Sequence, residues 1–198
     1  TSDTGAAETS YKRALELTPN DFEVHNNLGN LYSDQEQLEA AVSSYETAIK
    51  LNNDYPQAHN NLGVVLQKQG DLTAAESQFR EALRLTPGYA DAANNLGDVL
   101  QSLGRAEAAT NCYRDALAGD ANNAAAHNNL ATMLQGQGDM AGAAEHFRKA
   151  VQLKPDFHQA LSNLGHLLED QGQSRNAVAC YQDAFQARTG IEFDGDTD

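Results

Sequence analysis

A five-residue stretch, His25-Asn26-Asn27-Leu28-Gly29, returns along the chain every 34 residues without insertion or deletion. The later copies are His59-Asn60-Asn61-Leu62-Gly63, Ala93-Asn94-Asn95-Leu96-Gly97, His127-Asn128-Asn129-Leu130-Ala131 and Leu161-Ser162-Asn163-Leu164-Gly165. A fixed period of about 20–50 residues indicates an array of small units, each packed only against its neighbours. The 198 residues therefore predict a solenoid rather than a domain built around one central core.

Each repeat predicts two helices joined by a short turn. In the second full repeat we expect a first helix over 56–69, which starts with a proline where proline is tolerated, and a second helix over 72–85. Gly70 between them suits the left-handed conformation that ends many helices. Later repeats have glycine at the same place, at Gly104, Gly138 and Gly172. The first full repeat has Glu36 there instead.

The recurring apolar positions predict how these helices pack. One column is leucine in all five full repeats, and the residue after it is always small. In the second helices two alanines, seven residues apart, flank an aromatic residue, as in Ala75, Phe79 and Ala82. Small and large residues at helical spacing predict helices that approach closely, with each aromatic ring seated between them.

These columns resemble the tetratricopeptide repeat (TPR) family, which has the same period and the same Leu-Gly, Tyr, Ala, Phe and Pro landmarks. The resemblance covers about 6–188 and implies an all-α fold, a right-handed α-solenoid of antiparallel helix pairs. The Asn-Leu-Gly repeats also resemble the superhelical arm of O-linked N-acetylglucosamine transferases. The family often has Trp three residues before the leucine, where this chain has His25, His59, Ala93, His127 and Leu161.

We expect one repeat array over 1–188 and an acidic tail over 189–198. The array begins with the second helix of a partial repeat, 1–21, because these residues align with the later part of the next repeat. Five full repeats are expected over 22–55, 56–89, 90–123, 124–157 and 158–188. Solenoids generally close with a polar-faced cap, and none is visible, so we interpret the chain as a piece of a longer protein.

Charge and composition exclude several classes of partner. Asp and Glu number 28 against 13 Lys and Arg, which gives a formal charge of −15. Nucleic acids and anionic membranes attract basic patches, and the sequence has none. No apolar run approaches the roughly 20 residues that span a bilayer. We therefore expect no nucleic-acid partner and no direct membrane insertion, and a protein ligand that is basic or neutral.

The two cysteines, Cys112 and Cys180, stand two repeats apart. Helices in contact lie about 10 Å apart, so two repeats separate the thiols by about 20 Å. A disulfide needs Cα atoms within about 7 Å. We therefore expect two unpaired cysteines that act as small apolar residues, which favours a reducing compartment such as the cytoplasm.

The first helices carry the candidate binding surface, since the TPR resemblance implies that ligands lie in a concave groove lined by them. Carboxamides both donate and accept hydrogen bonds, so a regular row of them can hold the backbone of an extended peptide. One ladder comprises Asn27, Asn61, Asn95, Asn129 and Asn163. A second row comprises Asn26, Asn60, Asn94 and Asn128, with Gln67 and Gln101 further along. The alternative is that each asparagine forms a hydrogen bond to a neighbouring helix and stiffens the array of repeats.

Metal binding and catalysis are not expected. His25, His59 and His127 suggest a metal site, and His25 and His59 would lie about 10 Å apart at Cα. All three replace a core aromatic, however, and are expected to pack against the second helix. The tail residues Asp194, Asp196 and Asp198 alternate as in a calcium loop whose later ligands are missing. No metalloprotease, nucleotide-binding or serine-hydrolase motif occurs, so we predict no cofactor and no enzymatic activity.

The favoured function is a non-catalytic protein–protein interaction scaffold that binds an extended peptide or partner segment in the concave groove. One alternative is the substrate-recognition arm of a larger glycosyltransferase-type enzyme. Another is a structural protein that self-associates into dimers or filaments through its uncapped ends.

Overall fold

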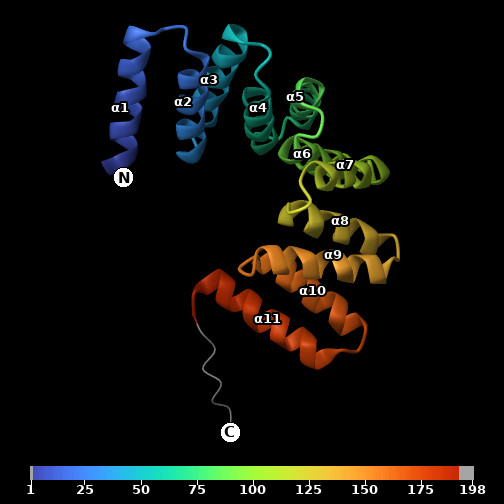
Figure 1. Cartoon of the computed structure of the whole chain (residues 1–198). Helices are drawn as coiled ribbons and strands as arrows, with labels where there is room; N and C mark the ends of the chain where they lie inside the picture. Colours follow the sequence, from blue (N-terminus) through green and yellow to red (C-terminus); the bar gives the residue numbers. More distant parts are fainter. Residues whose placement is uncertain (1, 192–198) are drawn as a thin grey trace. The chain divides into compact units, whose positions relative to one another are not determined.

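The computed structural model describes residues 2–191, and these are almost entirely helical, with no strand among them (Figure 1). The helices in this part of the chain are α1 (Ser2–Leu17), α2 (Phe22–Asp34), α3 (Leu38–Leu51), α4 (Pro56–Lys68), α5 (Leu72–Leu85), α6 (Ala90–Ser102), α7 (Ala106–Gly119), α8 (Ala124–Gly136), α9 (Met140–Leu153), α10 (His158–Asp170) and α11 (Ser174–Thr189). The predicted all-α repeat fold is confirmed. The acidic stretch 192–198, with its three alternating aspartates, lies outside the described residues.

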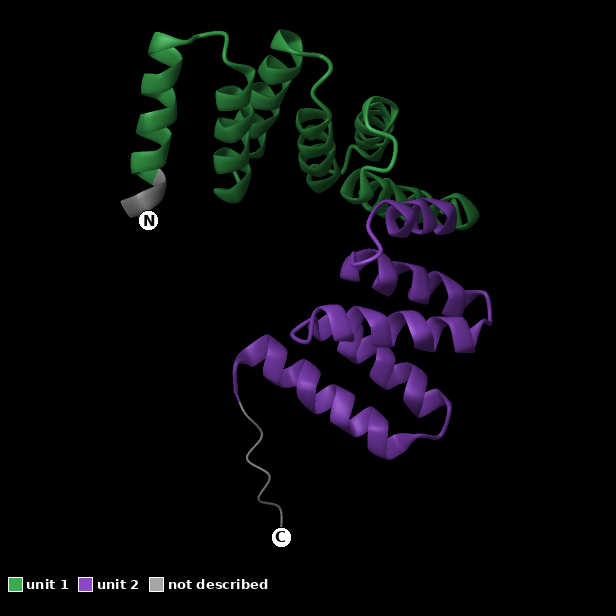
Figure 2. Ribbon diagram, viewed as in Figure 1, with its two compact units in different colours: residues 1–109 green, residues 110–198 purple. Residues whose placement is uncertain are grey.

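The chain divides into two compact units, residues 1–109 and 110–198 (Figure 2). Within unit 1, α2 packs on α3 and α4 on α5, and these hairpins stack through α3 with α4 and α5 with α6. Within unit 2, α8 packs on α9 and α10 on α11, and α9 packs on α10. Helix α7 begins in unit 1 and continues in unit 2. Each unit is thus a stack of helix hairpins.

The turn inside each hairpin contains one residue in the left-handed conformation. Gly70 has φ of 86°, and its N–H donates to the Gln67 carbonyl at 3.0 Å. In the first full repeat Glu36 has φ of 59°, and its N–H donates to the Ser33 carbonyl at 3.1 Å. The backbone therefore makes the same turn whether the residue is glycine or glutamate, although only glycine adopts this conformation without a steric cost.

The core of each hairpin forms where an aromatic ring of the second helix lies on the backbone of the first. A Cβ atom built on Gly63 would stand 2.7 Å from the buried ring of Phe79. Gly29 has the same relation to Tyr45, at 2.6 Å. Real carbon atoms do not approach so closely, so these positions exclude even a methyl group. The predicted close approach of the two helices is confirmed.

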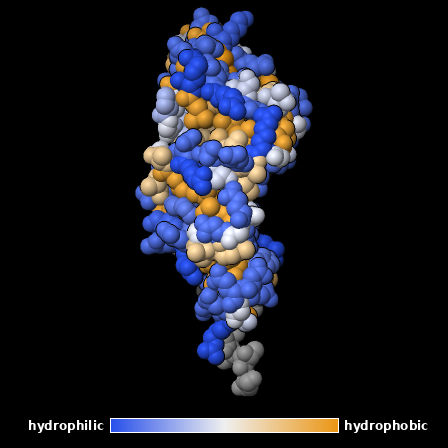
Figure 3. All heavy atoms as spheres, turned by 90° about the vertical axis from the view of Figure 1, so that its right-hand side faces the viewer, coloured by the Kyte–Doolittle hydropathy of each residue, from blue (hydrophilic) through white to orange (hydrophobic). Residues whose placement is uncertain are grey.

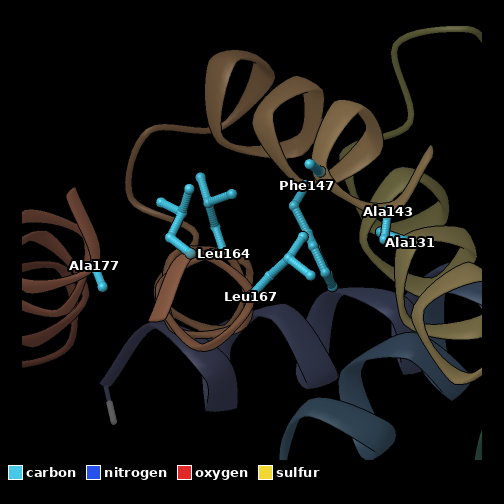
Figure 4. Packing of buried hydrophobic residues seen from close by; sticks show 8 residues of the cluster. Ala131, Ala143, Phe147, Leu164, Leu167 and Ala177 are labelled. Atoms are coloured by element: carbon cyan, nitrogen blue, oxygen red, sulfur yellow. The ribbon is translucent and has the colours of Figure 1, made fainter. Parts of the chain in front are cut away.

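In the hairpin of α8 and α9 the corresponding residue is Ala131, which is buried in a cluster with Phe147 and Leu167. Figure 4 shows Phe147 reaching from α9 toward Leu167 of α10, with Ala143 and Ala131 nearby. The cluster joins the two hairpins of unit 2, because its members come from α8, α9, α10 and α11. The alanines leave room for the larger side chains between the helices.

We predict that Gly63→Ala lowers the free energy of unfolding by about 1–3 kcal/mol, because the added methyl group displaces the Phe79 ring. The matched control is Gly5→Ala in α1, where a Cβ meets nothing within 4 Å. There the better helix propensity of alanine should raise stability by about 0.5–1 kcal/mol. Urea unfolding followed by circular dichroism measures both, and equal shifts in the same direction would contradict the packing argument.

Glu36→Gly should raise the free energy of unfolding by about 0.5–1 kcal/mol, because it relieves a left-handed non-glycine residue in an exposed turn. The same change inside a helix, Glu46→Gly in α3, should instead cost about 1 kcal/mol. The opposite signs distinguish backbone strain from loss of the glutamate side chain. Thermal melts measure both variants, and a lower melting temperature of Glu36→Gly would contradict the interpretation that the backbone at Glu36 is strained.

Candidate interaction surface on the first helices

The structure separates the two asparagine rows, which the sequence predicts to share an accessible surface. Asn27 is exposed, and the ladder members of later repeats are half-buried: Asn61, Asn95, Asn129 and Asn163. The second row is buried, with exposed fractions between 2% and 7% at Asn26, Asn60, Asn94 and Asn128. Burial at this level removes the second row from direct contact with an extended ligand, so the expectation that it faces the groove needs correction.

The buried row holds neighbouring repeats together. In unit 1, Asn61 Nδ2 donates to Asn26 Oδ1 at 3.2 Å, and Asn95 Nδ2 donates to Asn60 Oδ1 at 3.0 Å. In unit 2, Asn163 Nδ2 donates to Asn128 Oδ1 at 2.9 Å. Each bond joins a first helix to the first helix of the preceding repeat. These contacts provide the stiffening that is the alternative interpretation of the ladder.

The hydrogen bonds also determine what the ladder can offer a ligand. Asn61 uses both of its amide hydrogens, since Nδ2 also donates to Asn30 Oδ1 at 3.0 Å. Its oxygen accepts from Asn60 Nδ2 at 3.4 Å. A carboxamide oxygen has two lone pairs, so one acceptor site remains on Asn61. Asn95 donates one amide hydrogen to the Asn60 oxygen, as Asn61 does to the Asn26 oxygen.

Two further residues of the predicted set lie on the same helices of unit 1. Gln67 is half-buried near the end of α4, and Gln101 is exposed near the end of α6. They stand six residues after Asn61 and Asn95 respectively, about 1.7 helical turns further along. The structure thus places amides at two levels along the first helices.

Some polar residues of the first helices accept hydrogen bonds from tyrosine hydroxyls of the second helices. The Tyr45 hydroxyl donates to Asn30 Oδ1 at 2.8 Å. The Tyr181 hydroxyl donates to Glu169 Oε2 at 2.8 Å and lies 3.0 Å from His166 Nδ1. Desolvation, with the Glu169 hydrogen bond, raises the pKa of Tyr181 to about 12. Sequence reasoning missed this pairing because the partners are 12 and 15 residues apart on different helices.

The histidines that precede the asparagines join one repeat to the preceding inter-repeat loop. Nε2 of His59 donates to the Asn53 carbonyl at 3.0 Å, and Nδ1 lies 2.8 Å from Gln78 Oε1 of the second helix. Nε2 of His25 makes the same contact with the Pro19 carbonyl, at 3.0 Å. The structure therefore places His59 in a buried structural role against the second helix, as the sequence predicts.

Two negative findings apply to the residues that the structure describes. No three or more His, Cys, Asp or Glu side chains come together in a group that could hold a metal ion. None of the helices is long and apolar enough to cross a membrane.

Family models for the TPR repeat match residues 3–35 and 29–70, and models for the tetratricopeptide repeat match 54–122, 94–156 and 158–189. These matches follow one another along nearly the whole chain. The protein therefore belongs to the tetratricopeptide repeat family. Among curated proteins, none matches the sequence.

Solved structures share the fold at low sequence identity. A Pseudomonas aeruginosa PilF structure has a TM-score of 0.78 at 23% identity, covering 84% of this chain and 76% of that one. YrrB, described as a TPR protein with an unusual peptide-binding site, has a TM-score of 0.66 at 23% identity, covering 90% and 92%. MamA has a TM-score of 0.67 at 21% identity, covering 82% and 95%. These likenesses establish the fold.

Asn95→Ala should lower the free energy of unfolding by about 1–3 kcal/mol, because it leaves the buried Asn60 oxygen without its donor. The matched control is Asn27→Ala at the exposed first position of the same ladder, where we expect a change within about 0.5 kcal/mol. Chemical unfolding of both variants tests the difference. Equal losses would show that the inter-repeat bond contributes nothing beyond the side chain itself.

Proposed function

We propose that the chain is a protein-interaction scaffold in which the first helices of unit 1, α2, α4 and α6, hold the backbone of an extended peptide. The ligand contacts are assigned to the accessible amides, Asn27, Asn61, Asn95, Gln67 and Gln101. The buried row holds these amides in place without touching the ligand. The stiffening and binding interpretations of the asparagines are therefore two parts of one arrangement.

The observation that carries this proposal is the fixed orientation of Asn61. Three hydrogen bonds hold its carboxamide and leave one acceptor site on the oxygen. A side chain already fixed in this way loses little conformational entropy when a ligand binds. An acceptor of this kind suits a peptide N–H.

The chemistry of the surface indicates which partners it suits. Amides contact the peptide backbone, which is common to all sequences, so binding should tolerate many ligand side chains. The net charge of −15 attracts basic segments and repels acidic ones. The face shown in Figure 3 carries hydrophilic residues interspersed with hydrophobic patches. The YrrB structure, whose title records a peptide-binding site on a TPR protein, is consistent with such a use of the fold.

To test backbone recognition, peptides selected from a phage-displayed library of unstructured sequences are synthesised with single N-methylated amides. Methylation of an amide that donates to the ladder should weaken binding by roughly 3- to 10-fold, the worth of one hydrogen bond. Alanine replacement of individual peptide side chains should have smaller effects. Isothermal titration measures both series, and the opposite order would contradict backbone recognition.

On the protein side, Asn27→Ala and Gln101→Ala should each weaken the same peptide by a similar factor, since both residues are exposed on the first helices. The control is Ser77→Ala, an exposed position on the second helix α5. Thermal melts establish that all three variants remain folded. Unchanged affinity of Asn27→Ala and Gln101→Ala would refute the assignment of the site.

A further inference from the structure

Two imidazole rings meet inside the hairpin formed by α8 and α9, in unit 2. His127 of α8 and His146 of α9 bring their Nδ1 atoms within 2.8 Å, and their ring centroids lie 5.0 Å apart. His127 is buried, and His146 is half-buried. The rings are 19 residues apart in sequence, and the hairpin alone brings them together.

The lone pair of His127 points at His146. Nε2 of His127 lies 3.1 Å from the Ala121 carbonyl oxygen, which can only accept, so Nε2 carries the proton and donates. A neutral ring then has its lone pair on Nδ1, the atom that faces His146. A histidine that donates one ring N–H to a backbone carbonyl and presents the other nitrogen has the arrangement found in metal-ligating histidines.

We propose that His127 and His146 bind a divalent transition-metal ion, such as zinc or nickel, through their two Nδ1 atoms. Metal–nitrogen bonds of about 2.0–2.1 Å in tetrahedral geometry space two nitrogens about 3.3 Å apart. The rings thus need to separate by about half an ångström. His146 transfers its proton from Nδ1 to Nε2 through solvent, so two neutral rings bind the ion with no net proton release.

The surroundings leave room for the remaining ligands. The pair borders an open cavity of about 670 Å³, large enough for waters to complete the coordination sphere. The neutral form of each imidazole ring is the form that binds a metal ion. Glu145 in the cavity lining favours a cation, whereas Arg148 and Lys149 oppose one. Two imidazoles select zinc, nickel or copper over magnesium and calcium, which prefer oxygen.

Unit 1 contains a natural counterpart that lacks one ligand. His59 occupies the place of His127, and its Nε2 donates to the Asn53 carbonyl in the same way. Gln78 occupies the place of His146, with its Oε1 2.8 Å from His59 Nδ1. An amide is a poor ligand for these ions, so we assign no metal to this pair. His146→Gln therefore recreates a pairing that the fold already accommodates.

The test is titration of the intact, tag-free chain with Zn²⁺ and with Ni²⁺, followed by calorimetry and by nitrogen-15 NMR of the histidine rings. We expect one equivalent to bind, with shifts at Nδ1 of His127 and His146, and no binding of Mg²⁺. His146→Gln should weaken binding about tenfold or more, since even outer-shell partners of metal sites contribute this much. Circular dichroism of this variant should remain that of the wild type.

The reverse substitution, Gln78→His, should add a second equivalent per chain by building the same pair in unit 1. No second equivalent would contradict the geometric argument. The proposal is overturned if the wild-type chain binds neither ion, or if His146→Gln binds both as the wild type does. It does not rest on peptide binding, and a chain that binds metal without binding peptides would leave it intact.

Discussion

The contact on which the rest of the structure depends is an aromatic ring lying directly on the backbone of the neighbouring helix. Phe79 touches α4 at Gly63, where even a methyl group does not fit, and Tyr45 does the same at Gly29. This close approach buries a large apolar side chain between the two helices of a hairpin. A solenoid has no central core that could bury it instead. The spacing of the hairpin then decides which polar residues meet. The asparagine and histidine contacts are consequences of this packing.

The asparagines add a polar link that the apolar columns cannot supply. A buried carboxamide without partners would cost free energy, and the ladder asparagine of the next repeat satisfies it in both units. These hydrogen bonds also orient the amides that remain accessible. In unit 1, stability and the proposed recognition surface therefore depend on the same residues, with different atoms of Asn61 serving each purpose.

Equivalent positions in the repeats carry different chemistry on one scaffold. The ring of the second helix is tyrosine where a polar residue of the first helix accepts from it, as at Asn30 and Glu169. It is phenylalanine in the repeats of Val64 and Thr132. The residue facing the buried histidine is Gln78 in unit 1 and His146 in unit 2. Once the hairpin is stable, such positions can vary without loss of the fold, so a repeat protein can acquire a local site in one repeat.

The sequence by itself determined the helices, their pairing and the family, because these follow from periodic features: a 34-residue repeat, small residues opposite aromatic ones, and glycines at the turns. It also predicted a candidate binding surface on the first helices. It could not decide which amides remain accessible, because residues such as Asn26 and Asn27 are adjacent in the sequence, and only helix packing buries the first and leaves the second more accessible. The meeting of His127 with His146 likewise needed the tertiary structure. A side-chain contact depends on the rotation of each helix about its axis. Sequence periodicity defines that rotation only approximately, so it does not predict that the Nδ1 atoms of these two histidines are in contact.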